Sequence, residues 1–190
     1  MKKALVVDDK VENRRQVAEA LVSYGFTDII EAENGQQAVD LAVAHKPLLI
    51  VMDVGMPIMD GITAAEIISK KAPAPIVLLT GKTDAETIER ARLAGVMNYV
   101  VKPFREEQFH PAVDLAIHHF VCESSLRDEV DKLKDTLETR KVIEKAKGVL
   151  MKNGLSEEAA YRRLQKMAMN NRKSLRQVAE AILLTDGMVG

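Results

Sequence analysis

Short apolar runs rich in β-branched residues alternate with longer segments of helical spacing over the first hundred residues of the chain. Such alternation predicts a parallel sheet with helices on both of its faces. Five strands in about 100 residues fit the strand order 2-1-3-4-5, so the expected fold class is α/β, a flavodoxin-like (βα)5 unit. The expected strands are Leu5–Val7, Asp28–Ala32, Leu48–Met52, Pro75–Leu79 and Asn98–Val101.

The pattern changes after Phe104, where helical spacing replaces the strand-like runs. Pro111 suits the first turn of a helix, because its missing N–H would have no partner there. No Gly or Pro lies between Pro111 and Gly148, so we expect a stiff helical linker rather than a flexible tether. Apolar residues at heptad spacing predict either pairing with a second chain as a coiled coil or packing on the helix's own domain. These seam residues are Leu126, Val130, Leu133 and Leu137.

The last part of the chain reads as three helices. The first runs from about Thr139 to Lys152, where Asn153 and Gly154 form a stop signal. Ser156 can cap the second helix, and Ser174 with Gln177 three residues later forms a capping box for the third. We therefore expect a first domain at residues 1–120, a helical linker or coiled coil at 121–138, and a three-helix bundle at 139–190.

The net charge of −1 hides a gradient along the chain. Residues 139–176 hold 11 Lys and Arg against 3 Asp and Glu, whereas residues 105–138 hold 4 against 9. A locally basic segment in a nearly neutral chain is typical of a module that binds a polyanion, and it is equally compatible with a solvated helical surface.

Other features of the composition narrow the class of protein. The single cysteine, Cys122, cannot form an internal disulfide, which favours a reducing compartment. No apolar run approaches the roughly 20 residues needed to span a bilayer, and the N-terminus lacks the pattern of a signal peptide. We expect a cytoplasmic protein with no membrane partner. The sequence has no Gly-rich phosphate loop of the Walker type and no evident nucleophile with a positioned base, so we do not expect an enzyme.

Charged or hydroxyl-bearing side chains lie directly after four of the predicted strands. Asp8 and Asp9 follow the first, Asp53 the third, Thr80 the fourth and Lys102 the fifth. Carboxyl ends of parallel strands meet at one edge of the sheet, so these groups should converge there. Three carboxylates need a cation among them, and oxygen ligands with room for a phosphate favour Mg²⁺. Together with the Lys102 ammonium and the Thr80 hydroxyl, such a site can hold a phosphoryl group on a carboxylate.

Four segments carry a family resemblance: LVVDD at 5–9, MDVGMPIMDG at 52–61, LTG at 79–81 and YVVKPF at 99–104. They resemble the motifs of response-regulator receiver domains over about residues 1–120. The resemblance implies that a sensor histidine kinase phosphorylates Asp53. It implies that Asp8, Asp9, Asp53 and the backbone carbonyl of Gly55 hold Mg²⁺, that Lys102 pairs with the phosphoryl group, and that Thr80 and Tyr99 move inward as a switch.

The basic residues of the C-terminal helices favour a nucleic-acid partner. RNA loops are recognised by stacking on aromatic rings and by hydrogen-bond donors to base edges, while phosphates fix position. Three helices are also compatible with a helix-turn-helix, so the residues alone leave a receiver-controlled, DNA-binding transcription regulator as an alternative.

A second resemblance favours RNA. The pattern RxxIxxAKGVLM at 140–151, with AY at 160–161, Leu164, AM at 168–169 and LxxVA at 175–179, resembles the ANTAR domain. That resemblance implies an output that binds paired RNA hairpins in a leader transcript and prevents formation of a terminator. By that likeness Arg140, Lys147 and Tyr161 are the candidates for RNA contact.

The two resemblances together suggest how the halves are linked. Phosphorylation adds about −1.5 to −2 charges at pH 7 and can bias a two-state element. One alternative is that phosphorylation exposes a masked output in a monomer. Our hypothesis is that phosphorylation of Asp53 promotes a homodimer through the face near the fourth and fifth strands and the Leu126–Leu137 seam. Two RNA-binding domains would then be presented together.

Overall fold

The computed structural model describes residues 2–81, 85–96 and 98–186. The chain divides into two compact units, Met1–Ser124 and Ser125–Gly190, and each is described by itself. Within the described part of the chain, no helix combines the length and the apolar character needed to cross a membrane.

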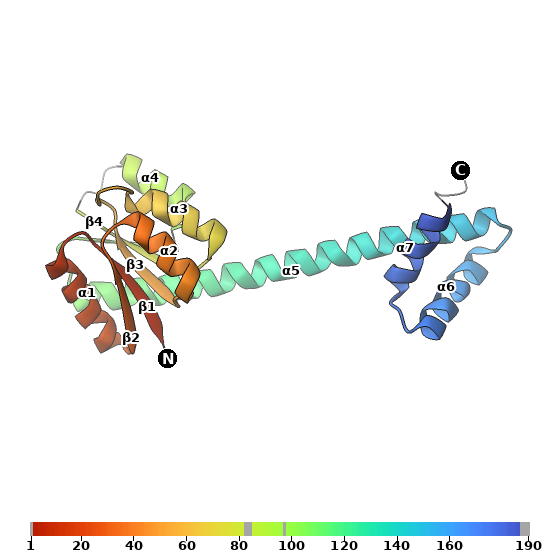
Figure 1. Ribbon diagram of the computed structural model, residues 1–190, viewed down its shortest axis with the longest axis horizontal. Helices are drawn as coiled ribbons and strands as arrows, with labels where there is room; N and C mark the ends of the chain where they lie inside the picture. The colour runs from red at the N-terminus through yellow and green to blue at the C-terminus, as the bar shows by residue number, and fades with distance from the viewer. Residues whose placement is uncertain (1, 82–84, 97, 187–190) are drawn as a thin grey trace. The chain divides into compact units, whose positions relative to one another are not determined.

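The first unit is built on a five-stranded parallel sheet in the order β2-β1-β3-β4-β5 (Figure 1). The strands are β1 (Lys3–Val7), β2 (Asp28–Ala32), β3 (Leu49–Asp53), β4 (Ile76–Thr80) and β5 (Asn98–Val101). The helices between them are α1 (Val11–Tyr24), α2 (Gly35–His45), α3 (Gly61–Lys71) and α4 (Ala85–Leu93). The predicted α/β class and strand order are confirmed. Strands β3 and β4 each lie one residue further along the chain than predicted, so Asp53 and Thr80 are their last residues.

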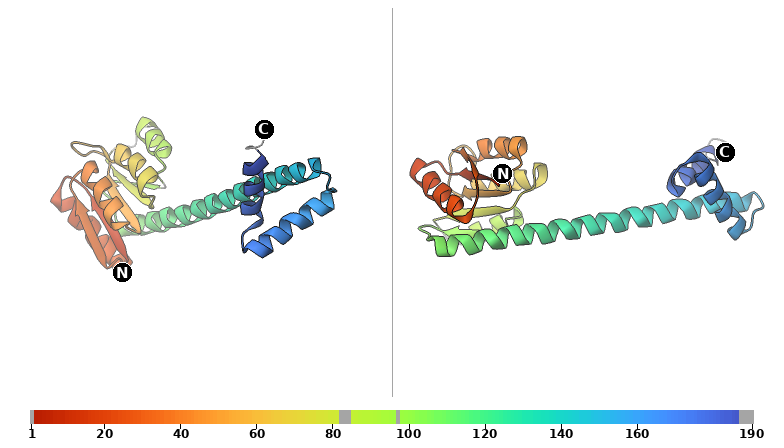
Figure 2. Two further views of the ribbon diagram at one scale, coloured as in Figure 1. Left: turned by 45° about the vertical axis from the view of Figure 1, so that its right-hand side comes forward. Right: turned by 90° about the horizontal axis from the view of Figure 1, so that it is seen from below.

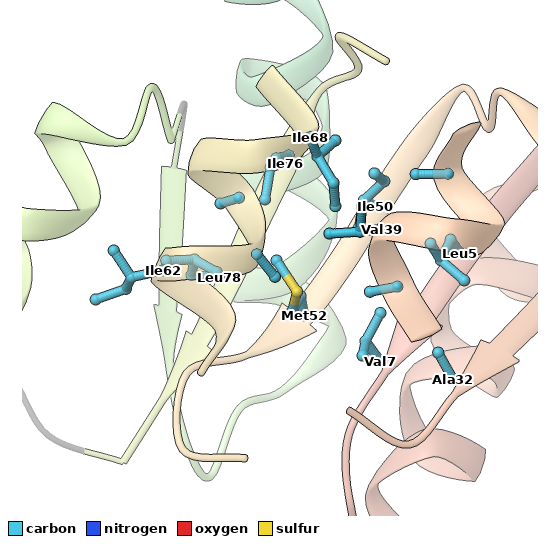
Figure 3. Close-up of a cluster of buried hydrophobic side chains, with 14 of the residues drawn as sticks. Leu5, Val7, Ala32, Val39, Ile50, Met52, Ile62, Ile68, Ile76 and Leu78 are labelled. Atoms are coloured by element: carbon cyan, nitrogen blue, oxygen red, sulfur yellow. The ribbon is translucent and has the colours of Figure 1, made fainter. Parts of the chain in front are cut away.

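Alternate residues of the central strands enter two different cores, because side chains along a strand point to opposite faces. Leu5 of β1 and Ile50 of β3 pack with α2 and α3 in one core (Figure 3). Val6 and Val51, their neighbours in the sequence, pack in the other core with α1 and the start of the helix that follows β5. Every residue of β3 and of β4 is buried, as expected of strands covered on both faces.

The helix after β5 is one continuous element, α5 (Glu106–Lys152). Its predicted start at Pro111 is wrong, because α5 begins five residues earlier. Phe109 is fully buried and stacks on Phe104 with ring centroids 5.2 Å apart, which anchors the first turn to the core. Pro111 therefore lies inside the helix, where it has no N–H to donate to the carbonyl of Glu107. The helical linker is confirmed, but the predicted helix from Thr139 to Lys152 is the end of α5 and has no start of its own.

In the second unit, α6 (Glu157–Asn171) and α7 (Leu175–Asp186) pack on the C-terminal part of α5 (Figures 1 and 2). The core of this bundle includes Ala146 of α5, Leu164 of α6 and Ala179 of α7, all fully buried. Ser156 caps α6 by accepting a hydrogen bond from the N–H of Ala159. Ser174 and Gln177 exchange the two hydrogen bonds of a capping box before α7. The predicted three-helix bundle is confirmed up to Asp186, and residues 187–190 lie outside the described residues.

Gly61, the first residue of α3, allows a close approach between two parts of the backbone. A Cβ atom built there would lie 2.0 Å from the carbonyl oxygen of Asp53. We predict that Gly61→Ala lowers the free energy of unfolding of the first unit by about 3 kcal/mol, because α3 must move away from the end of β3. Urea denaturation followed by circular dichroism measures the change. Gly81→Ala is the control, since a Cβ there meets nothing within 4 Å. Equal stability of the two variants would contradict the prediction.

Candidate functional site

The carboxyl ends of the parallel strands bring together four of the side chains that the sequence singled out. Asp8 follows β1, Asp53 ends β3, Thr80 ends β4, and Lys102 follows β5. The peptide bond between Lys102 and Pro103 is cis. This edge of an open parallel sheet is where such folds bind ligands. Asp8, Asp53 and Lys102 are in contact there, whereas Asp9 is exposed.

The Lys102 ammonium lies between two buried carboxylates. It donates to Asp8 Oδ2 at 2.6 Å and also to Asp53 Oδ1. Asp8 is 1% exposed and Asp53 is 8% exposed. Burial alone would lower the pKa of Lys102, but the hydrogen bonds to Asp53 and Asp8 outweigh it and raise that pKa. Lys102 therefore stays charged and offsets the repulsion between the two carboxylates.

The two oxygens of Asp53 have different partners. Oδ1 accepts from Lys102, and Oδ2 accepts from the backbone N–H of Gly55 at 2.9 Å. These two donors fix the orientation of the carboxylate at the strand end. Gly55 and Asp9 are exposed, so the pocket is open on their side. A carboxylate held in this way next to a fixed cation is suited to accept a phosphoryl group.

Two residues of α1 that the sequence analysis did not single out orient Asp8. The side-chain amide of Asn13 donates to both carboxylate oxygens of Asp8, at 2.9 and 3.0 Å. Arg14 is 6% exposed and donates to the backbone oxygen of Asp8 at 2.9 Å and to Glu31 at 2.9 Å. Both residues lie in the first turn of α1, directly after the Asp8–Asp9 pair. Their position next to this pair in the sequence could have indicated a role in the site. Which side chains of α1 contact Asp8, however, depends on the conformation of the turn between β1 and α1.

The donor set at this edge fits a magnesium ion by its chemistry. The carboxylates of Asp8, Asp9 and Asp53 and the backbone carbonyl of Gly55 would be hard oxygen ligands of the kind that Mg²⁺ prefers. Within residues 2–81, 85–96 and 98–186, no three acidic, histidine or cysteine side chains are close enough to hold a metal by themselves. A metal here would therefore depend on the Gly55 carbonyl and on oxygens from water or phosphate as well.

Thr80 and Tyr99 differ in exposure. Thr80 is 5% exposed at the end of β4, while Tyr99 on β5 is 41% exposed. Leu115 of α5 is also exposed and lines a shallow hollow together with Tyr99, Val101 and Pro111. This face of the first unit thus presents apolar side chains to solvent.

The seam residues on α5 form a row of exposed apolar side chains. Leu126, Val130, Leu133 and Leu137 are 63%, 46%, 58% and 58% exposed. In the described part of the chain they do not belong to any of the three hydrophobic cores.

The three candidates for RNA contact lie in different surroundings. Arg140 is exposed and makes no ion pair with any residue that the structure describes, and Tyr161 is 39% exposed. Lys147 is 8% exposed, and its ammonium donates to Glu144 of α5 at 3.0 Å and to Glu157 of α6 at 2.7 Å. Hydrogen bonds to Glu157 and Glu144 raise the pKa of Lys147. The Glu144 partner was visible in the sequence as an i, i+3 pair, whereas the Glu157 partner required knowledge of how α6 packs.

Comparison with protein families accounts for both units. Residues 4–114 match the response regulator receiver domain, and residues 131–183 match the ANTAR domain.

Two curated proteins illustrate the range of relatives. The transcriptional regulatory protein PdtaR of Mycobacterium tuberculosis is 44% identical over 187 residues, which cover 98% of this chain and 91% of PdtaR. The chemotaxis protein CheY of Bacillus subtilis is 36% identical over 60% of this chain and 96% of its own length.

Solved structures match the first unit. The response regulator domain of Thermotoga maritima CheB is 30% identical with a TM-score of 0.53, covering 62% of this chain and 93% of that domain. The chemotaxis response regulator CheY4 of Vibrio cholerae is 28% identical with a TM-score of 0.56, covering 61% of this chain and 98% of that chain. From the two domain matches and the full-length likeness to PdtaR, the chain belongs to the response-regulator family, as a receiver domain followed by an ANTAR domain.

Proposed function

We propose that this protein is a phosphorylation-controlled transcription antiterminator of the cytoplasm. A sensor histidine kinase phosphorylates Asp53, phosphorylation promotes a homodimer, and the paired ANTAR domains bind RNA hairpins of a leader transcript. The observation that carries the proposal is the Asp8–Lys102–Asp53 arrangement, in a chain whose second domain is an ANTAR domain. It is a regulatory role rather than a metabolic enzyme activity.

The chemistry at Asp53 follows from its hydrogen bonds. A carboxylate oxygen of Asp53 forms the new O–P bond as the N–P bond to the kinase histidine breaks, and the bonding electrons return to that nitrogen. Lys102 balances the added negative charge from a fixed position. Mg²⁺ held by Asp8, Asp9, Asp53 and the Gly55 carbonyl would supply Lewis-acid stabilisation of the phosphoryl oxygens.

The switch we propose uses the contrast between Thr80 and Tyr99. The buried Thr80 hydroxyl lies at the edge where the phosphoryl group forms, so it can donate to a phosphoryl oxygen after a small movement. Tyr99 would turn inward with it and change the apolar face that it shares with Leu115. Such a change alters the surface offered to a second copy.

The seam supports a homodimer as the active form. Each exposed leucine or valine buried against a second helix removes apolar surface from water and stabilises the pair. Two ANTAR domains held together would bind two linked hairpins with a raised effective concentration.

Within the ANTAR domain, Arg140 and Tyr161 are free to meet RNA. Arg140 supplies an exposed guanidinium with no ion pair among the described residues, and Tyr161 an exposed ring for stacking. The charge of Lys147 is already neutralised by Glu144 and Glu157, so we assign Lys147 mainly to holding α5 against α6.

The central prediction concerns RNA affinity. Stem-loop RNAs selected from a library with randomised loops, tested as single and as tandem hairpins, should bind the protein more tightly after phosphorylation of Asp53. The affinity should fall as salt rises, since phosphate contacts release counterions. A fluorescence-anisotropy titration at two salt concentrations measures both effects, and Asp53→Asn is the control. Preference for duplex DNA over every selected RNA would favour the DNA-binding alternative.

Removal of the bridging cation should impair phosphorylation. In Lys102→Met the buried carboxylates of Asp8 and Asp53 lose their shared partner, and we expect the rate of phosphoryl transfer to Asp53 to fall by about tenfold or more. Transfer is followed on Phos-tag gels with a small-molecule phosphoryl donor. Lys70→Met is the matched control, because Lys70 is an exposed lysine of the same unit that pairs with Glu66. A normal rate in Lys102→Met would exclude a catalytic contribution from Lys102.

Disruption of the seam should prevent dimerisation without harming the fold. We expect wild-type protein to double its mass on phosphorylation and Leu133→Lys to remain monomeric, since a charged residue at a buried seam position opposes pairing. Sedimentation velocity measures the mass. Leu184→Lys is the control, because Leu184 is 69% exposed and lies outside the seam. A dimer of Leu133→Lys, or no mass change in the wild type, would rule out this route of activation.

A further inference from the structure

The ANTAR domain carries its charges on two distinct sides. On one side, Lys147 and Tyr161 line a hollow of about 440 Å³ with Glu144, Glu157 and Glu158. One lysine among three glutamates leaves this side net negative. It therefore repels the phosphates of a nucleic acid, whatever Tyr161 contributes by stacking.

The other side is formed by a stretch without any acidic residue. Residues 163–176 contain five Lys and Arg and no Asp or Glu. One of the five, Arg176, is ion-paired with Asp135 and Glu180. The other four are exposed and make no ion pair in the part of the chain that the structure describes. These four residues, Arg163, Lys166, Arg172 and Lys173, are called the basic surface below.

The basic surface is continuous along the end of α6 and the turn that follows. Arg163 and Lys166 are three residues apart on α6 and so lie on the same side of the helix. Arg172 ends α6 in the left-handed conformation, with φ of 51°, and Lys173 comes next. The uncharged Asn170, one further turn along from Lys166, is exposed beside them.

Compensation of the α6 dipole does not explain the whole surface. Cations stabilise a helix only in its last turn, which accounts for Arg172 and Lys173 at most. Arg163 and Lys166 lie nine and six residues before Arg172. Arg162 has an acidic partner in Glu158, one turn earlier on α6, but among the described residues neither Arg163 nor Lys166 has such a partner. The charges of Arg163 and Lys166 are exposed and take no part in the contacts that hold the described fold, so an external partner is the role left to explain them.

We propose that the basic surface binds the phosphate backbone of the RNA, while the acidic hollow around Lys147 makes no phosphate contact. This inference rests on the proposed RNA-binding function and assigns a surface to it. The expected partner is the stem of a hairpin, whose phosphates can be followed by cations spaced along α6 and its C-terminal turn.

The test compares variants of the full-length phosphorylated protein on a stem-loop RNA selected from a randomised-loop library. We expect Arg163→Gln/Lys166→Gln to weaken binding about 10- to 100-fold at low salt and to reduce the slope of log K against log salt by about 2, one for each lost phosphate contact. Lys145→Gln/Lys152→Gln removes the same charge from two exposed lysines of α5 that form no salt bridge within the described residues, and we expect less than a threefold change. Arg163→Lys/Lys166→Arg should retain binding, and circular dichroism should show the same helicity in all variants.

Three results would count against this assignment in different ways. If no RNA is selected by the wild type, the proposed RNA-binding function itself fails. If RNA is selected and the Arg163→Gln/Lys166→Gln variant binds it with unchanged affinity and slope, the basic surface is not the RNA site. If the control pair weakens binding as much, the effect is one of total charge and the assignment to this surface is overturned.

Discussion

A partly buried ammonium between two buried carboxylates constrains the whole receiver. Lys102 can reach Asp8 and Asp53 only if β1, β3 and β5 end at one edge of the sheet. In the order β2-β1-β3-β4-β5, β4 lies between Lys102 and both of its partners. The cation must therefore be carried on a long, flexible side chain, and the residue that ends β4, Thr80, has a short one. Burying either carboxylate without that ammonium would be costly.

The same constraint explains which parts of the pocket the sequence predicts. Strands buried on both faces appear as unbroken apolar runs, and a polar residue after such a run marks the sheet edge. That rule located Asp8, Asp53, Thr80 and Lys102 to within a residue of their strand ends. The rule says nothing of Asn13 and Arg14, because their roles depend on how the first turn of α1 folds back over Asp8.

Contacts between residues far apart in the sequence explain two other differences from the predictions, the start of α5 and the surroundings of Lys147. Pro111 is a favourable first-turn residue, but the burial of Phe109 against Phe104 stabilises an additional helical turn before it. That tertiary contact outweighs the local preference of proline. The sequence predicts Lys147 to be a surface cation. The packing of α6 on α5 brings Glu157 to it, which the sequence does not show.

Helix α5 belongs to both cores, which bears on how the halves communicate. Phe109 is fully buried in the receiver core and Ala146 in the core of the ANTAR domain, and both are residues of α5. Residues 106–152 form one continuous helix, and the seam within it contains neither Gly nor Pro. In the proposed mechanism, phosphorylation of Asp53 acts through the surface that α5 offers to a second copy, without melting of a linker.

Burial and pairing separate the cations of this chain into two kinds. Arg14, Lys102 and Lys147 are wholly or largely buried, and each is bound to carboxylates or carbonyls of its own fold. Their charge is used within the molecule, and an external anion would have to displace those partners. Exposed cations without ion pairs keep their charge available, and salt screens them until a polyanion displaces the counterions. This distinction, rather than the net charge of −1 or the local count of basic residues, identifies the surface that a nucleic acid can use.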